Sequence, residues 1–310
     1  MNKRTILVAD HLFEKKNFFE YKKSKLRFNI VFNSSLKPIN DQFLIKYFKN
    51  NQRIVGVVAG LEKYNKFTLA YQKNLKVISR VGVGVDSLDL NFLKKKKIKV
   101  LRLTNELTNS VAELNLSLIL CLSRKVLDNY ILLKNKIWEP IISDNLKDRK
   151  IGILGFGKIG KKTYKLLKNF KSKIYIFEKK FLNTKYIKTS LKTIFKKCDI
   201  VCICLSLNQS TKYIINKNIF KKTNKRIMIV NTARGALINE KDLYLFLKKN
   251  KKASAFVDCF ENEPYTGKLL GLKNLFFLPH VASYTKQARK DMEYSASKKL
   301  VQYLDKIEKD

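Results

Sequence analysis

Short apolar runs rich in β-branched residues alternate along the chain with stretches of helical spacing. In the first third the runs cover 5–9, 28–32, 54–58, 76–79 and 98–102. A second series begins at Ile151 and continues at 173–177, 200–205, 226–231, 253–258 and 275–278. Strands that alternate with helices form parallel sheets covered on both faces. We therefore predict an α/β protein with two doubly wound parallel sheets, the second of five or six strands.

Two helices mark the limits of the predicted domains. Ser110-Val111-Ala112-Glu113 has the Ser-x-x-Glu spacing of a capping box, which predicts a helix from Ser110 through about Leu122. From Thr285 onward, apolar residues recur at helical spacing, and we expect this helix to return to the first domain. The predicted domains are 1–104 with 285–310, and 105–284.

The chain carries a large positive charge that is spread evenly. Its 310 residues suffice for two domains, and 45% of them are hydrophobic, which favours folded cores. The net charge is +40, but only ten of the 65 basic residues are Arg, and the Lys do not gather in one stripe. Specific nucleic-acid recognition favours clustered Arg, so we expect only weak, salt-sensitive binding to anionic polymers.

The five Cys show neither the paired spacing of a zinc site nor that of a disulfide scaffold. Strand alternation places Cys202 and Cys204 on one face as small buried side chains. We therefore predict no metal and a reducing compartment. Asp10 interrupts the short apolar stretch near the N-terminus, and no run reaches the length of a membrane span. The expected location is the cytoplasm, without a membrane partner.

A glycine-rich turn follows the predicted strand at Ile151. Gly155, Gly157 and Gly160 stand in G-x-G-x-x-G register between an apolar strand and a helical stretch that includes Lys158 and Ile159. Such glycines permit a tight turn and let the backbone approach a pyrophosphate, and the helix N-terminus favours the anion. The segment predicts a dinucleotide site.

An acidic residue follows this turn at the spacing of a ribose ligand. Glu178 ends the next strand, eighteen residues after Gly160. A carboxylate there accepts hydrogen bonds from ribose hydroxyls and repels a 2′-phosphate, which favours NAD over NADP. Lys179 and Lys180 favour NADP instead, since their charges would attract a 2′-phosphate.

Four further segments complete an ordered set of motifs: RVGVGVD at 80–86, NTARG at 231–235, DCFENEP at 258–264 and PH at 279–280. With SVAE and the glycine turn, they resemble the D-isomer-specific 2-hydroxyacid dehydrogenases over about residues 50–305. The resemblance implies a Rossmann-type NAD-binding domain inserted in a flavodoxin-like substrate domain. It also implies a homodimer and an enzyme that transfers a hydride between nicotinamide and a small D-2-hydroxy acid.

Reduction of a 2-oxo acid needs a hydride donor, a proton donor and an anchor for the carboxylate. His280 is one of two His in the chain, and imidazole gives and takes protons near neutral pH. Arg234 follows the end of a predicted strand, and its planar guanidinium suits a carboxylate with an adjoining carbonyl.

The resemblance assigns the remaining roles. Glu263, directly before Pro264, is expected to hydrogen-bond His280 and stabilise its imidazolium form; Glu261 is its competitor. The expected cofactor contacts also include Thr232, Ala233 and Asp258, the last with the nicotinamide amide. The substrate carboxylate is expected on backbone amides of Val81, Gly82, Val83 and Gly84.

One departure from the family bears on the substrate. Phosphoglycerate dehydrogenases usually carry an Arg-Ser pair where this chain has Ala59 and Gly60, and Lys63 is a different kind of anchor. D-3-phosphoglycerate is still the first substrate expected, followed by glyoxylate or hydroxypyruvate. A non-catalytic NAD(H) sensor is the rival interpretation, although such a sensor has no need of Arg234, Glu263 and His280 together.

Overall fold

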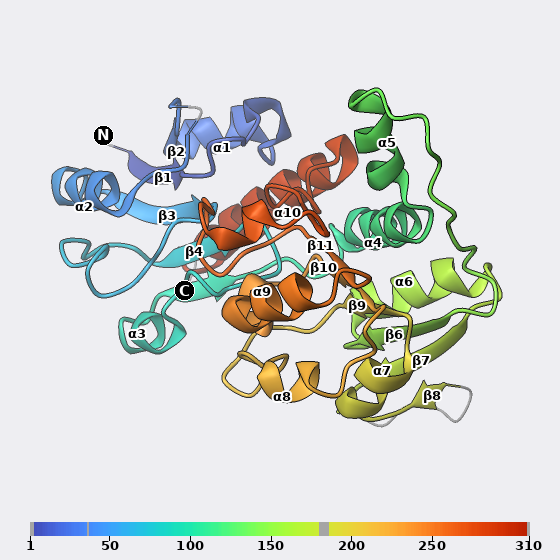
Figure 1. Ribbon diagram of the computed structural model, residues 1–310. Helices are drawn as coiled ribbons and strands as arrows, with labels where there is room; N and C mark the ends of the chain where they lie inside the picture. Colours follow the sequence, from blue (N-terminus) through green and yellow to red (C-terminus); the bar gives the residue numbers. More distant parts are fainter. Residues whose placement is uncertain (1–2, 36, 180–185, 309–310) are drawn as a thin grey trace. The chain divides into compact units, whose positions relative to one another are not determined.

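We describe a computed structural model of the protein over residues 3–35, 37–179 and 186–308 (Figure 1). The chain divides into two compact units, Met1–Leu107 with Thr285–Asp310, and Thr108–Tyr284. The first break therefore falls after Leu107, where the sequence suggested Thr104. The two units are described separately below as unit 1 and unit 2.

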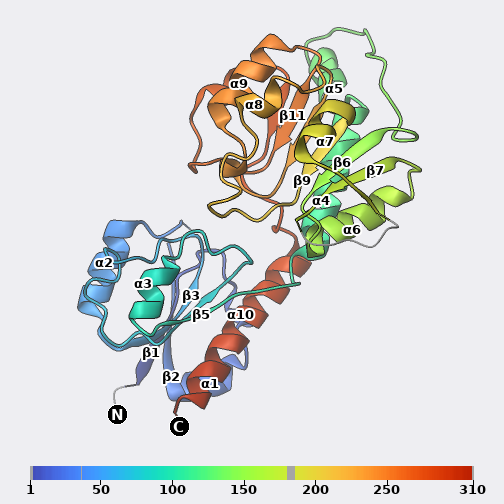
Figure 2. The same ribbon diagram turned by 90° about the horizontal axis from the view of Figure 1, so that it is seen from below.

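Unit 1 is built on a five-stranded parallel sheet in the order β2-β1-β3-β4-β5. Helices α2 and α3 cover one face, and α10 lies along the other (Figure 2). Its elements, in chain order, are β1 (Arg4–Val8), α1 (Tyr21–Arg27), β2 (Phe28–Phe32), α2 (Asp41–Asn50), β3 (Ile54–Ala59), β4 (Val77–Arg80), α3 (Leu90–Lys95), β5 (Lys99–Leu101) and α10 (Lys286–Lys306).

Strand β3 shows why both faces of this sheet are covered. All six of its residues are buried, as expected for a central parallel strand. Gly56 faces α10 so closely that an added Cβ would lie 3.1 Å from Leu300. The Ser79 hydroxyl of β4 donates a hydrogen bond to the Ala296 carbonyl at 2.8 Å. The C-terminal helix is thus an integral layer of unit 1.

Unit 2 contains a seven-stranded parallel sheet in the order β12-β11-β10-β9-β6-β7-β8. Its elements, in chain order, are α4 (Thr108–Ser123), α5 (Val126–Lys134), β6 (Lys150–Leu154), α6 (Lys158–Lys168), β7 (Lys173–Phe177), β8 (Ile187–Lys188), α7 (Leu191–Lys197), β9 (Ile200–Ile203), α8 (Lys217–Phe220), β10 (Met228–Asn231), α9 (Glu240–Lys249), β11 (Ser254–Val257) and β12 (Leu275–Phe277).

Two apolar layers sandwich this sheet. Helices α4 and α6 pack on one face, and α7, α8 and α9 pack on the other (Figure 2). The strand order reverses between β6 and β9, which makes this the switch point where open α/β sheets bind ligands. The predicted fold class, two parallel-sheet α/β domains, is confirmed.

Two local expectations were wrong. The second sheet has seven strands rather than five or six, because β8 pairs with β7 although both of its residues are exposed. Helix α4 begins at Thr108, so Ser110 lies inside it and does not cap it. The Ser110 hydroxyl instead donates to the Ala282 carbonyl at 2.6 Å. A distant partner thus replaces the predicted capping box.

Candidate active site

The glycine turn joins β6 to α6 in the way a dinucleotide site requires. Gly155 has φ +92°, a backbone conformation that side chains with a Cβ rarely adopt. Gly157 precedes α6, and an added Cβ there would meet no atom within 4 Å, so the backbone is open to a ligand. An added Cβ on Gly160 would lie 2.1 Å from the Gly155 carbonyl oxygen. The turn thus fits a pyrophosphate at the helix N-terminus.

The predicted ribose ligand lies against this turn. One carboxylate oxygen of Glu178 accepts a hydrogen bond from the Phe156 amide at 2.9 Å. The acid is therefore held next to the glycines. The Lys179 ammonium donates to the Ser210 hydroxyl at 3.0 Å, while Lys180 lies outside the described residues.

Two asparagines, which the sequence did not reveal as site residues, fix the segment after β10. The Asn231 side chain accepts from the Ala233 amide at 3.1 Å and donates to the Arg234 carbonyl at 3.0 Å. The Thr232 hydroxyl donates to fully buried Asn115 at 2.6 Å. The sequence signal that could have identified Asn115 is its polar side chain within the apolar run of α4.

Arg234 stands at the start of a short 3-10 helix, Gly235–Leu237. Its guanidinium donates to the Ala233 carbonyl at 2.6 Å. An added Cβ on Gly235 would lie 2.0 Å from the backbone of Phe260, so only glycine permits this approach. The arginine loop is thereby packed against the segment that carries Glu263.

Glu263 and His280 form the central contact of the site. Nδ1 of His280 lies 2.8 Å from Oε2 of Glu263, and Oε1 accepts from the Phe260 amide at 2.9 Å. Burial raises the pKa of Glu263, but the hydrogen bond and charge of His280 outweigh it, and the pKa lies below its ordinary value. The carboxylate therefore stays ionised beside the imidazole.

Glu261 is engaged elsewhere. Its carboxylate accepts a hydrogen bond from the Tyr213 hydroxyl and lies 3.9 Å from the Lys212 ammonium. Of the two candidate glutamates, the structure brings only Glu263 to His280.

Asp258 holds the backbone that follows the histidine. It is fully buried, and its two oxygens accept from the amides of Val281 and Ala282 at 2.8 and 2.9 Å. Burial raises the pKa of Asp258 against the effect of these amides. His280 itself has φ +58°, which is uncommon for a residue other than glycine and persists only where its surroundings enforce it. The hydrogen bonds from Val281 and Ala282 to Asp258 hold this backbone conformation in place.

The predicted carboxylate-binding turn belongs to unit 1. The Val81 amide donates to the Ala59 carbonyl at 2.9 Å and extends the sheet, so it is already used. Gly82, Val83 and Gly84 form the turn beyond it. Ala59 is fully buried, and Lys63 is exposed.

Over residues 3–35, 37–179 and 186–308, no group of three or more His, Cys, Asp or Glu is placed to hold a metal ion. Over the same residues, none of the helices has both the length and the apolar character needed to cross a membrane.

A glycine turn at the switch point of a parallel sheet, with a paired histidine and carboxylate in the same unit, defines a dinucleotide-dependent oxidoreductase. Residues 116–282 match the family model of the D-isomer specific 2-hydroxyacid dehydrogenase, NAD binding domain. The chain belongs to this family, and this segment is its NAD-binding domain. The predicted family and cofactor are confirmed.

Curated relatives carry more than one activity. A hydroxypyruvate reductase of Thermotoga maritima is 35% identical over 76% of this chain and 80% of its own length. A human glyoxylate reductase/hydroxypyruvate reductase is 31% identical over 74% of both chains. The D-3-phosphoglycerate dehydrogenase of Bacillus subtilis is 28% identical over 77% of this chain, which spans 46% of that relative.

Solved structures share the fold. A glyoxylate reductase from Paecilomyes thermophila superposes with a TM-score of 0.86 at 22% identity, over 97% of this chain and 95% of that one. An NAD+-bound 3-phosphoglycerate dehydrogenase from Entamoeba histolytica gives 0.81 at 21% identity, over 98% and 96%.

Proposed function

We propose that the protein reduces a small 2-oxo acid to the D-2-hydroxy acid with NADH, and that His280 supplies the proton. The observation that carries this proposal is the 2.8 Å contact between His280 Nδ1 and Glu263. A carboxylate on Nδ1 fixes the ring orientation and stabilises the imidazolium, which leaves Nε2 to face the substrate carbonyl oxygen.

Residues of this chain orient the substrate and supply the proton. Bound nicotinamide supplies the hydride that reaches the carbonyl carbon. Arg234 orients the substrate carboxylate and polarises the carbonyl, and Nε2 of His280 gives its proton to the carbonyl oxygen as negative charge develops there. Amides of Gly82, Val83 and Gly84 are the further proposed donors to the carboxylate.

The proposed cofactor contacts extend from the glycine turn to the loop after β10. Gly155, Gly157 and Gly160, with the helix start at Lys158 and Ile159, hold the pyrophosphate, and Glu178 holds the ribose. Thr232 and Ala233 line the nicotinamide end. Asp258 keeps one lone pair on each oxygen beyond its two amide bonds, which permits an added contact with the nicotinamide amide.

Hydroxypyruvate or glyoxylate is placed ahead of D-3-phosphoglycerate as the substrate. The fully buried Ala59 offers no charge to a phosphate, and the exposed Lys63 is a flexible point charge. Relatives at 35% and 31% identity bear the names of reductases for the unphosphorylated acids. D-3-phosphoglycerate is the second candidate, supported by the named dehydrogenases among the relatives.

The experiment is to mix purified protein with NADH and a panel of 2-oxo acids and to follow cofactor oxidation. The panel contains hydroxypyruvate, glyoxylate and 3-phosphohydroxypyruvate. Turnover of at least one acid is expected. NADH binding without turnover of any acid would contradict the proposal and favour a sensor.

The proposal includes a homodimer in a reducing compartment, with the cytoplasm as the location. All five Cys are free thiols, which suits reducing conditions. Self-association is supported by an exposed apolar surface on α5 and the segment after it, made up of Val126, Tyr130, Ile131, Leu133, Ile137, Trp138, Ile141 and Ile142.

A further inference from the structure

A buried carboxylate that takes no part in the proposed reaction lies at the carboxyl edge of the sheet in unit 1. Glu62 follows β3 and is only 5% exposed. Neither of its carboxylate oxygens, nor the hydroxyl of fully buried Tyr64, makes a hydrogen bond of good geometry among the described residues, although the amides of Gly60 and Glu62 and the Tyr64 hydroxyl interact with the carboxylate. Burial of a carboxylate without good hydrogen bonds destabilises the folded protein. Its presence here therefore indicates a functional role.

The carboxylate packs against the end of β3, next to the proposed substrate turn. An added Cβ on Gly60 would lie 2.7 Å from Oε1 of Glu62. The preceding residue, Ala59, pairs with Arg80 of β4 and accepts the Val81 amide. Neighbouring strands lie about 5 Å apart, so the end of β3, which Glu62 follows, lies about one strand spacing from the start of the turn at Gly82.

A buried cation, Arg80, lies at the same edge. Arg80 is 6% exposed, donates to the Val81 carbonyl at 2.6 Å, and lies against Gly82, where an added Cβ would be 3.1 Å from its guanidinium. Asp10, at the end of β1, is bound by Arg289 through both of its oxygens. The positive charge of Arg80 thus favours binding of one anionic group at the turn, while the negative charge of Glu62 disfavours binding of a second.

We propose that Glu62 is a specificity-determining residue: through its buried charge it makes this edge accept 2-oxo acids with an uncharged group on the third carbon and reject those with a phosphate there. A phosphate dianion would be repelled by the buried Glu62 carboxylate, and the exposed Lys63 is only a flexible point charge to set against it. This inference rests on the proposed function and narrows its substrate.

The charge state of Glu62 agrees with this role under mildly alkaline conditions. Burial raises the pKa of Glu62 to about 7, and the charge of Asp10 adds to the rise, whereas Arg80 and the nearby backbone amides oppose it. Tyr64 is the other titratable group that faces it. At pH 8 the carboxylate is mostly ionised, and so is a substrate phosphate.

The test compares kcat/KM for hydroxypyruvate and for 3-phosphohydroxypyruvate, with NADH, at pH 8. Wild-type protein is expected to prefer hydroxypyruvate by at least about tenfold, and Glu62→Gln should narrow that preference by about tenfold, mainly through a lower KM for the phosphorylated acid. General damage to the fold would lower both values together and leave their ratio unchanged.

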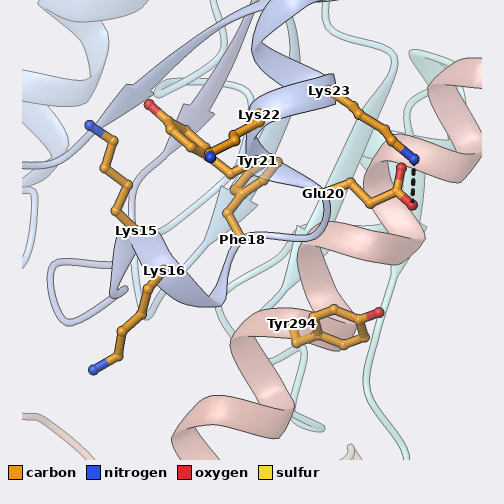
Figure 3. Close-up of a pocket in the computed structure, with 8 residues that line it drawn as sticks. All are labelled: Lys15, Lys16, Phe18, Glu20, Tyr21, Lys22, Lys23 and Tyr294. Atoms are coloured by element: carbon orange, nitrogen blue, oxygen red, sulfur yellow. Dashed lines mark ion pairs between the residues drawn. The ribbon is translucent and has the colours of Figure 1, made fainter.

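Glu20→Gln is the matched control. Glu20 lines an exposed, lysine-rich hollow of the same unit and lies 3.7 Å from the Lys23 ammonium (Figure 3). Its replacement makes the same change in net charge and should leave the substrate ratio at the wild-type value.

Three results would overturn the inference. A ratio that Glu62→Gln leaves unchanged would remove Glu62 from specificity while leaving the proposed function intact. A wild-type preference for the phosphorylated acid would do the same, even if the variant does not fold. No turnover of either acid by the wild-type protein would overturn the inference, and it would overturn the proposed function as well if glyoxylate is not reduced either.

Discussion

Two carboxylates near His280, those of Glu263 and Asp258, have different partners and opposite pKa shifts. Glu263 contacts the imidazole, and that contact lowers its pKa despite burial. Asp258 accepts hydrogen bonds from the backbone amides of Val281 and Ala282, and burial raises its pKa. The first contacts the imidazole ring itself, and the second holds the backbone that follows it.

Residue types and spacing predicted the reacting pair but not what supports it. The Glu-Pro and Pro-His steps identified Glu263 and His280 because few residues carry that chemistry. Asp258 was expected to contact the cofactor, and its bonds to the backbone after His280 join residues that are 23 and 24 positions apart. Pairings of this kind are set by the folded sheet and leave no local pattern.

Glu178→Ala tests the ribose site. The carboxylate lies at the glycine turn, where it would bind ribose hydroxyls and repel a 2′-phosphate. The variant should lose at least about tenfold of the preference for NADH over NADPH in kcat/KM, since a charged hydrogen bond contributes about 1.5–3 kcal/mol. An unchanged NADH/NADPH ratio would remove Glu178 from the site.

Glu62 also predicts a pH dependence of stability. Its pKa rises from 4.5 to about 7 on folding, so the folded form binds the proton more tightly and loses stability as pH rises through this window. Glu62→Gln removes that loss. The free energy of urea unfolding of the variant minus that of wild type should therefore increase by about 2–3 kcal/mol between pH 5 and pH 8.

The Glu20→Gln variant provides the comparison for this measurement as well, because Glu20 is exposed. The difference in unfolding free energy between Glu62→Gln and wild type could also stay the same at pH 5 and pH 8. That result would mean that Glu62 is not held in a buried, proton-binding state.

Strands and helices follow from the apolar pattern wherever an element is buried. Strands β2 and β7 have the expected bounds, because apolar runs end where turns begin. Strand β8 was missed because its two residues are exposed and have no apolar pattern. The start of α4 was misplaced because Ser110 bonds to a carbonyl 172 residues away. Elements fixed by distant contacts were therefore beyond local prediction.

Gly160→Ala tests the strand–turn–helix element. The new methyl would lie 2.1 Å from the Gly155 carbonyl oxygen, a backbone atom that cannot move without opening the turn. We expect NADH affinity, measured by fluorescence titration, to fall at least about tenfold, with a loss of stability of about 1–3 kcal/mol. Lys165→Ala, at an exposed position of α6, is the control and should bind NADH normally. Normal binding by Gly160→Ala would refute the proposed pyrophosphate site.

At the scale of the whole molecule, the charge and the apolar surface predict different associations. A net charge of +40 gives weak attraction to polyanions that salt screens. The surface on α5 and the segment after it includes Trp138 at 84% exposure and Ile142 at 97%. Such a surface favours a stable partner, and a second copy is the partner we propose.

Light scattering tests this association. The wild-type protein should have twice the chain mass of 36.2 kDa, and the double variant Trp138→Ser, Ile142→Ser should shift toward the monomer. Leu245→Ser, at an exposed apolar position of α9 outside this surface, should leave the mass unchanged. A monomeric wild-type protein at high concentration would refute the dimer.

The account as a whole depends on proton transfer by His280, and its most direct test is the kcat of His280→Ala with NADH and the best 2-oxo acid, alongside NADH affinity. We expect turnover to fall by about 10²–10⁴-fold, the usual contribution of a general acid, while NADH affinity stays within about twofold of wild type. Unchanged turnover would contradict the account, because the proton would then come from another group.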